Sequence, residues 1–415
     1  MLECYVESDF TLRQLRQCPA GPHLDAFADW LRLAGYRQRP AQLALRGAAH
    51  LSHWAAARGI PTARLGEATL DAFVDHLSTC GCPHPFRGRD SYHAPGARRL
   101  VQFLRDTGVL APIAAKPQEL PPFAQGFATW MRQHRGVTPS TLAHYLPLVN
   151  EFLIALGEDA AEYDAGRVRA FVLARASRHG PSQAKSVVNA VRMFLRFLAA
   201  YGHCPAALIA AVPTVAAWRL ASLPRYIGAA DVERLVAACD PTHAAGARDR
   251  AVVLLLARVG LRAGDVRALR FAHIDWAQGR FRVIGKGRCE TWLPLPQEVG
   301  DAIVHYVEQF RPASPDDHIF LRCYAPRGPL PSSGPISKLV RRAIQRAGIH
   351  TPSMGAHLLR HSAATEMLRQ GASLDVIGAV LRHRCIESTA HYAKVNVPLL
   401  RAVAQPWPVD GGAPC

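Results

Sequence analysis

The last third of the chain carries a set of polar side chains that suits chemistry on a phosphate. The cationic and imidazole groups are donors to phosphate oxygens, and the phenol could attack the phosphorus atom. No carboxylate cluster at metal-ligand spacing and no GxxxxGK[ST] loop accompanies them in the sequence. The set therefore favours phosphoryl transfer that depends on positive charge in place of a metal ion. Its members are Arg262, Lys286, His357, Arg360, His383 and Tyr392.

Each of these residues also has an ordinary structural interpretation. Arg262 could pair with Asp265 on a helix surface, Lys286 could be a solvated turn residue, and His357 could cap a helix. Tyr392 could fill a helix face, as tyrosines commonly do. The order and spacing of the whole set favour a functional site over these separate explanations.

The segment around these residues is predicted to consist of helices and a single hairpin. Apolar residues at helical spacing recur through 229–240, 247–260, 300–310, 335–348, 357–371 and 373–383. Residues 280–296 instead alternate β-formers around a glycine-rich turn, which predicts a hairpin with Lys286 at its tip. On a helix, His357 and Arg360 lie three positions apart and share a face, so they could hold one anion together.

Proline-rich breaks at 111–123 and 203–227 divide the chain into segments. We expect an N-terminal helical domain over 1–115, a second helical domain over 116–205, a third domain over 222–405 and a short tail over 406–415. The first two segments share FADWLR with FATWMR, and then AFV and FLR, in the same order at offsets of 100, 98 and 91 residues. These matches predict a duplicated helical unit, although helices rich in Ala, Leu and Arg also match by chance.

The composition is that of a globular protein with a polyanionic partner. The chain has 415 residues, a formal net charge of +17 and a pI near 9.9, which favours binding to nucleic acid. The N-terminus does not resemble a signal peptide, and the apolar runs are too short to span a bilayer. The ten cysteines are scattered, so we expect a reducing, cytoplasmic location and no membrane partner.

One cysteine cluster, CGCPHP at 80–85, raises the question of a metal site. Cys80, Cys82 and His84 are possible zinc ligands, but no second paired set stands at a convincing spacing. The sequence therefore favours a loop rich in glycine and proline here, with no metal and no cofactor.

The third segment resembles the catalytic domain of the tyrosine recombinase (phage integrase) family. GLRAGDVRALRFAHID is similar to the family's first arginine box, and VIGKGR to its hairpin with the catalytic lysine. HLLRHSAAT is similar to the H-x-x-R box, and LRHRCIESTAHYAKV to the segment with the second histidine and the nucleophilic tyrosine. The resemblance covers roughly 180 residues and implies these catalytic positions: Arg262, Lys286, His357, Arg360, His383 and Tyr392.

The resemblance implies a mainly α fold. Two N-terminal helical domains of the SAM-like, core-binding type would precede a mixed α+β catalytic domain with a hairpin or three-stranded sheet. The layout is most like that of integrases carried by transposons. The implied activity is site-specific cleavage and rejoining of duplex DNA for a mobile element, through a 3′-phosphotyrosyl intermediate, without metal or cofactor. The implied partners are double-stranded DNA, further copies of the chain in a tetrameric synapse, and partner recombinases.

By the same resemblance, each site residue has a role. Tyr392 is the nucleophile and His357 takes its proton. The two arginines hold the non-bridging oxygens, where charge builds in the transition state, and the lysine protonates the departing 5′-oxygen. His383 donates a further hydrogen bond to the phosphate.

Arg382 departs from the family pattern, which usually has glycine before the second histidine. A negative φ there would cost little and the arginine could contact phosphate, whereas a positive φ could distort His383 and slow the enzyme. This keeps open a catalytically weak, DNA-binding accessory recombinase. Relaxation of DNA by the chemistry of a type IB topoisomerase is another alternative. After the tyrosine, residues 395–403 predict a short apolar helix, and the family resemblance implies that this helix docks on a neighbouring protomer.

Overall fold

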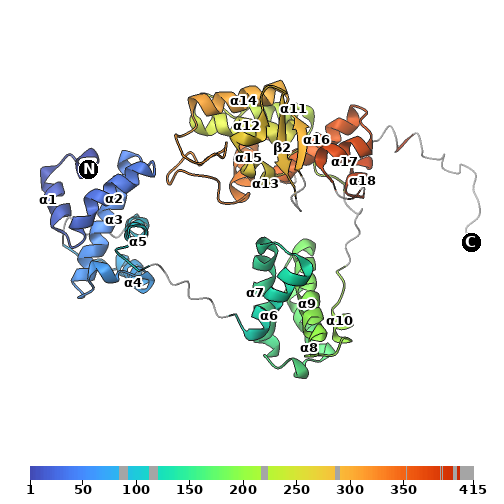
Figure 1. Cartoon of the computed structure of the whole chain (residues 1–415), viewed down its shortest axis with the longest axis horizontal. Helices are drawn as coiled ribbons and strands as arrows, with labels where there is room; N and C mark the ends of the chain where they lie inside the picture. Colours follow the sequence, from blue (N-terminus) through green and yellow to red (C-terminus); the bar gives the residue numbers. More distant parts are fainter. Residues whose placement is uncertain are drawn as a thin grey trace, which may run out of the picture. The chain divides into compact units, whose positions relative to one another are not determined.

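The computed structural model confirms a chain built mainly from helices (Figure 1). By its contacts the chain divides into two units, residues 113–221 and residues 1–112 together with 222–415. The predicted boundaries at 115 and 222 and the tail 406–415 lie outside the described residues, so the three-domain division stays a prediction. The structure describes residues 1–83, 92–111, 120–215, 223–285, 290–351, 353–383, 385, 387–395 and 400–401.

Residues 1–111 form a helical bundle around their own hydrophobic core, which extends from Leu2 to Leu110. Glycines bring two of its helices close together: a Cβ at Gly47 would lie 2.4 Å from the carbonyl oxygen of His93, and one at Gly96 would lie 2.7 Å from that of Ala44. The elements are η1 (Leu2–Cys4), α1 (Asp9–Gln17), α2 (Gly21–Leu33), α3 (Gln38–Ala56), η2 (Thr62–Arg64), α4 (Glu67–Leu77) and α5 (His93–Asp106).

Residues 120–215 form a second helical bundle, whose core extends from Ala124 to Val212. Prolines stand in the first turn of three of its helices, where a missing N–H costs nothing. No described helix in the chain is long and apolar enough to cross a bilayer. The elements are α6 (Pro122–Arg135), α7 (Pro139–Leu156), η3 (Ala160–Glu162), α8 (Ala165–Ala176), α9 (Pro181–Ala200) and α10 (Leu208–Ala211).

The two bundles repeat the same order of elements, as the sequence repeat predicts. α2, α3, η2, α4 and α5 of the first bundle correspond to α6, α7, η3, α8 and α9 of the second. Aromatic pairs recur at matching places in the two bundles, with similar separations between ring centroids. Phe27–Trp30 (5.9 Å) corresponds to Phe127–Trp130 (6.5 Å), and Phe27–Phe103 (5.4 Å) corresponds to Phe127–Phe194 (5.5 Å). Trp54–Phe73 (5.5 Å) corresponds to Phe152–Phe171 (5.2 Å).

The described part of residues 223–395 is built around the apolar helix α12. This helix contains the run AVVLLLA and is buried along it. α12 contacts α11, α13, α14, α15 and α16, and an apolar helix covered on all sides is expected to be a central one. The helices are α11 (Ala229–Ala237), α12 (Ala244–Arg258), α13 (Ala263–Ala268), η4 (Phe271–His273), α14 (Gln297–Gln309), α15 (Gly334–Arg346), α16 (Ala356–Arg369), α17 (Leu374–Leu381) and α18 (Glu387–Ala393).

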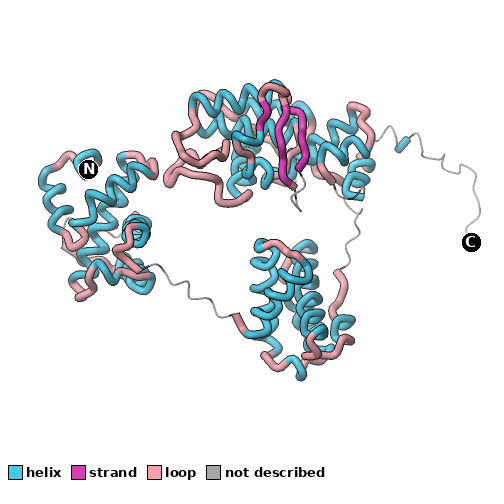
Figure 2. Tube along the Cα trace, viewed as in Figure 1, coloured by secondary structure: helices cyan, strands magenta, loops and turns pink. Residues whose placement is uncertain are grey.

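The predicted hairpin is present and belongs to a three-stranded antiparallel sheet in the order β1-β2-β3 (Figure 2). The strands are β1 (Ile274–Asp275), β2 (Arg280–Ile284) and β3 (Glu290–Pro294), and the hairpin register pairs Ile284 with Glu290. Phe281 and Val283 point into the core and alternate with more exposed neighbours. Residues 286–289, which include Lys286 at the predicted tip of the hairpin, lie outside the described residues.

Candidate active site

Five of the six predicted site residues are described, and the structure brings them together at the ends of packed helices. Arg262 is the N-cap of α13, and His383 follows the end of α17. The other three, His357 and Arg360 on α16 and Tyr392 on α18, lie on helices that pack against each other. The sixth residue, Lys286, lies outside the described residues, so its predicted place at the site stays a prediction.

Arg360 is the structural centre of this group. Its side chain is only 1% exposed, and its guanidinium donates to the main-chain carbonyl oxygens of Gly260 and Leu381. One oxygen belongs to the loop before α13 and the other to the end of α17. A guanidinium carries five N–H donors, so three are left for an anion. Arg360 thus joins two segments that are far apart in sequence while keeping donor capacity.

The loop before α13 needs glycine and places Arg262. Gly260 has φ +68, and a Cβ there would lie 2.6 Å from Cδ2 of Leu381. Two residues later, the exposed Arg262 donates from Nη2 to the carbonyl oxygen of Arg382 at 3.1 Å. This contact holds the guanidinium of Arg262 beside the end of α17, on the same part of the fold as His383.

The hydroxyl of Tyr392 contacts a histidine that the sequence interpretation did not include. Tyr392 is 2% exposed, and its Oη lies 2.8 Å from Nδ1 of His361. We expected His357 to be the partner of the tyrosine. The helical spacing explains the difference, because His357 is one turn earlier on α16 and its ring packs against that of His361 at 4.5 Å.

His383 is held by the helix that carries the tyrosine. Its Nδ1 lies 2.8 Å from Oγ1 of the buried Thr389, and its main-chain N–H donates to the carbonyl oxygen of Gly378 at 2.9 Å. The rings of His383 and Tyr392 are nearly parallel, with centroids 6.4 Å apart. The threonine therefore fixes the orientation of the imidazole beside the phenol.

Arg382 adopts the left-handed conformation that the sequence analysis identified as the costly alternative. Its φ is 54° at the C-cap of α17, where a non-glycine residue costs roughly 1–2 kcal/mol. Its guanidinium forms an ion pair with the Asp265 carboxylate, and both side chains are largely buried. The same carboxylate accepts the main-chain N–H of Arg262 at 3.1 Å. Asp265 thus helps to hold Arg382 in place and caps α13.

The site carries a surplus of positive charge. Burial, and then the charge of Arg262, lowers the pKa of the Arg360 guanidinium to about 10. Partial desolvation and the same two arginines lower the pKa of His383 to about 4 and also lower the pKa of His357. Burial, followed by neighbouring histidines, lowers the pKa of His361 to about 4. The positively charged forms of these side chains are therefore destabilised in the site, and binding of an anion would stabilise them.

The tyrosine environment requires a proton acceptor. Burial raises the pKa of Tyr392, and the nearby Arg360 only partly opposes the effect. The phenol is therefore protonated at neutral pH, while His361 beside it is neutral and has a nitrogen able to accept a hydrogen bond. Chemically, the arrangement can bind an anion with arginine and imidazole donors and can activate a phenol as a nucleophile.

Three residues that shape the site were not assigned site roles by sequence reasoning. His361 carried a signal, because it directly follows Arg360 and shares the α16 face of His357. Asp265 was considered as a surface partner of Arg262 and lies in the first arginine box, but its pairing with Arg382 spans 117 positions and has no local signal. Thr389 carried no recognisable signal, because its role depends on how α18 packs against the end of α17.

Comparisons with known proteins show the family of the chain. Residues 225–397 match the phage integrase family. Over nearly its whole length the chain is similar to the integrase/recombinase y4rA of Sinorhizobium fredii, with 38% identity over 417 residues, 98% of this chain and 99% of that protein. It is also 34% identical to the tyrosine recombinase XerD of Ralstonia nicotianae over 242 residues, 55% of this chain and 75% of that protein.

A solved structure shares the fold. The integrase of transposon Tn1549 (residues 82–397), in complex with circular intermediate DNA, matches with a TM-score of 0.51 at 13% identity and covers 68% of this chain and 98% of that chain. At this identity the match shows the fold alone. It confirms the expected class, helical domains followed by a mixed α+β domain with a small antiparallel sheet.

Proposed function

Because the chain belongs to the phage integrase family of tyrosine recombinases, we propose that it is a site-specific recombinase that cleaves and rejoins duplex DNA through a 3′-phosphotyrosyl intermediate. Its role would be the integration of a mobile element. The similarity to the integrase/recombinase y4rA, which extends over 98% of this chain, supports the reaction class.

The observation that carries this proposal is the convergence of cationic donors on one buried tyrosine. Burial, and then the charge of Arg262, lower the pKa of Arg360, which indicates that the two positive charges are closely spaced. A phosphodiester would place negative charge beside them. The phenol of Tyr392 is the nucleophile within this group, and its ring lies beside that of His383.

In the proposed reaction, Oη of Tyr392 attacks the scissile phosphorus and the bond to the 5′-oxygen breaks. The phenolic proton passes to His361, the neutral acceptor 2.8 Å away, whose ring contacts that of His357. The two arginines stabilise the charge on the non-bridging oxygens, and Lys286 protonates the leaving 5′-oxygen. The phosphotyrosyl bond conserves the phosphodiester energy, so a 5′-hydroxyl of another strand reverses the step without ATP or a metal ion.

The two helical bundles supply DNA binding in this proposal. Both contain the same order of helices, and the chain has a net charge of +17, which suits extended contact with phosphates. Strand exchange needs four active sites, so the active species would be a tetramer of this chain on DNA, alone or with partner recombinases.

The decisive experiment is a suicide-substrate assay with nicked duplexes taken from the element's ends. Wild-type protein is expected to form a covalent adduct through the 3′-phosphate, and Tyr392→Phe is expected to bind the duplex and form none. The Phe variant keeps the buried ring and loses only the hydroxyl, so it is a matched control for folding.

Other outcomes of the same assay distinguish the alternative functions. If neither protein forms an adduct although both bind the duplex, the chain is an accessory DNA-binding recombinase, and Arg382 at φ 54° is the first residue to test. If the wild type relaxes supercoiled plasmids that lack the element's ends, it acts as a type IB topoisomerase. A wild-type adduct that persists in Tyr392→Phe would assign the nucleophile elsewhere.

A further inference from the structure

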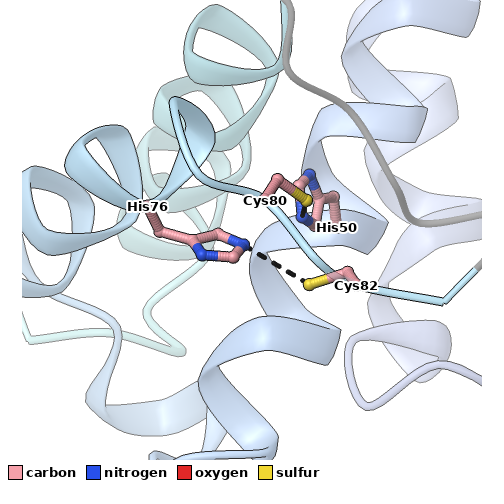
Figure 3. A group of neighbouring side chains, drawn as sticks. All are labelled: His50, His76, Cys80 and Cys82. Carbon is pink, nitrogen blue, oxygen red and sulfur yellow. Dashed lines mark hydrogen bonds between the residues drawn. The ribbon is translucent and has the colours of Figure 1, made fainter.

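The N-terminal bundle contains a compact group of two imidazoles and two thiols (Figure 3). His50 lies on α3, His76 lies on α4, and Cys80 and Cys82 follow α4 in the short segment that ends the described residues before position 84. The sequence interpretation considered the cysteines with His84, which lies outside the described residues, and missed both histidines. They come from an earlier helix and from the last turn of α4, where no ligand spacing marks them.

The four side chains have the separations that a single tetrahedral ion requires. Sγ of Cys80 lies 3.4 Å from Nε2 of His50, and Sγ of Cys82 lies 3.4 Å from Nε2 of His76. All four ligand atoms lie within 4.8 Å of one another. With Zn–S bonds of about 2.3 Å and Zn–N bonds of about 2.0–2.1 Å, the corresponding tetrahedron has edges of about 3.4–3.8 Å. Small adjustments would bring all four atoms onto one ion.

The outer surroundings of the group also suit a metal site. His50 is fully buried, and its second nitrogen, Nδ1, lies 3.1 Å from Nδ1 of His93 on α5. Metal-bound histidines commonly donate their other N–H to such a partner, which fixes the tautomer and the ring orientation. The close approach of α3 and α5 through Gly47 places these two rings together. His50 therefore has one nitrogen oriented by protein and the other directed at the thiols.

The second helical bundle shows that these four residues are not a general feature of the repeated unit. The pairs Trp54–Phe73 and Phe152–Phe171 align the two copies here at an offset of 98 residues. At this offset, the positions that match His50 and His76 hold Leu148 and Ala174. The positions that match the two cysteines hold Arg178 and Gly180. The fold of the second unit thus forms without these ligands, and of the two copies the first holds the complete set.

Thiol-to-imidazole hydrogen bonds alone would explain each close pair, but not why both pairs meet at one point. A thiol is a weak donor, and burying polar groups for two such bonds gains little. Two thiolates and two neutral imidazoles carry a charge of −2, which a divalent cation neutralises. A tetrahedral set of two sulfurs and two nitrogens is typical of zinc.

We propose that His50, His76, Cys80 and Cys82 bind one structural Zn²⁺ ion. Each thiol releases its proton when it coordinates, so binding of one ion releases two protons and changes no oxidation state. The ion would tie α3 to the end of α4 and to the segment after it. Such a site has all four positions filled by protein and is expected to stabilise the bundle without taking part in catalysis.

The first test measures zinc in the full-length protein, expressed without a polyhistidine tag and purified without chelators. Mass-spectrometric metal analysis is expected to find about one zinc per chain, consistent with one four-ligand site. Cys82→Ser, at the partly exposed edge of the group, is expected to lose most of this zinc. Cys4→Ser changes an exposed cysteine of the same bundle outside the group and is expected to retain it.

The second test uses Co²⁺ to report the ligands directly. Wild-type protein loaded with Co²⁺ is expected to show the intense absorption of tetrahedral cobalt with thiolate-to-metal charge transfer. Cys80→Ser and Cys82→Ser should each lose about half of the charge-transfer intensity per bound ion, since each removes one of two thiolates. Zinc-free wild-type protein that also gives no tetrahedral Co²⁺ spectrum would overturn the proposal, as would equal zinc in Cys82→Ser and Cys4→Ser. Neither readout depends on DNA cleavage, so the result stands apart from the proposed function.

Discussion

At the scale of single residues, the hydrogen bond between Tyr392 and His361 is the contact that bears most directly on reactivity. A phenol whose pKa is raised by burial needs an acceptor for its proton, and the imidazole 2.8 Å away is neutral near pH 7 because its own pKa is lowered to about 4. The ring of His357 packs at an angle of 79° against that of His361, with centroids 4.5 Å apart, and we propose that it orients His361 while His361 takes the proton.

This assignment predicts how His361→Ala changes the pH dependence of cleavage. Adduct formation should slow by about 10²–10⁴, the usual contribution of a general base, and the deficit should shrink as the pH rises toward the tyrosine pKa. Single-turnover rates on the nicked duplex between neutral and alkaline pH measure this. A constant deficit at all pH values would mean that His361 only positions Tyr392. Tyr392→Phe, which lacks the hydroxyl, is the baseline throughout.

Arg382 gives a second prediction at this scale, because its backbone lies in the left-handed region. Alanine is normally more stabilising than glycine by about 0.4–1 kcal/mol. Here the order should reverse, and Arg382→Gly should be more stable than Arg382→Ala by about 1 kcal/mol, since both lose the Asp265 ion pair and only alanine keeps the strain. Urea denaturation of the two variants gives the comparison. Equal stabilities, or a more stable alanine variant, would contradict the conformation.

At the scale of elements, α16 and the end of α17 carry histidines whose pKa values are lowered. Burial lowers the pKa of His361 from 6.5 to about 4, and partial burial does the same for His383 at the end of α17. Between pH 6.5 and 4 the unfolded chain therefore binds more protons than the folded one, so the stability present above pH 6.5 is lost as the pH falls toward 4. Thermal melts across this range should show the loss, and His361→Asn should make the dependence shallower. An unchanged slope in this variant would rule out His361 as a source.

The packing of α3 against α5 predicts a second effect at this scale. In Gly47→Ala the new Cβ would lie 2.4 Å from a main-chain oxygen of His93, so the helices must separate, and overpacking of this kind costs typically about 1–3 kcal/mol. Gly66→Ala is the matched control, because φ is −131° and nothing lies within 4 Å of its Cβ. Chemical denaturation should show the loss in the first variant only. A Gly47→Ala protein as stable as Gly66→Ala would mean that α3 and α5 pack differently.

The elements were largely predictable from the sequence, whereas contacts between them were not. The periodic apolar residues of α12 and the alternation of β2 are local signals, and the structure confirms both elements. The sequence boxes that carry the predicted site residues are local too, which is why Arg262 and Tyr392 could be named as candidates in advance. The pairing of Asp265 with Arg382 and the meeting of His50 with Cys80 depend on tertiary packing across many positions, for which a single sequence carries no periodic signal.

At the scale of the whole molecule, the repeated helical unit predicts that DNA contacts extend beyond the catalytic segment. Deleting residues 1–115 should shorten the nuclease-protection footprint and reduce the slope of log affinity against log salt, because fewer phosphates are neutralised. Adduct formation at a bound site should persist. An unchanged footprint would show that the first unit does not contact DNA, and loss of all cleavage at a bound site would show that it is needed for the chemistry.

The two inward hydrogen bonds of Arg360 also have a consequence for how the protein is made. The guanidinium is fixed only when the carbonyls of Gly260 and Leu381 are both present, and the nucleophile is added later still, at position 392. A polypeptide that ends before Leu381 would therefore lack one of the two carbonyls that fix Arg360, and any polypeptide that ends before position 392 would lack the reactive hydroxyl. Under the proposed chemistry, a translation product that ends before α18 is harmless to the chromosome, because the ability to break DNA arrives with the helix that carries Tyr392.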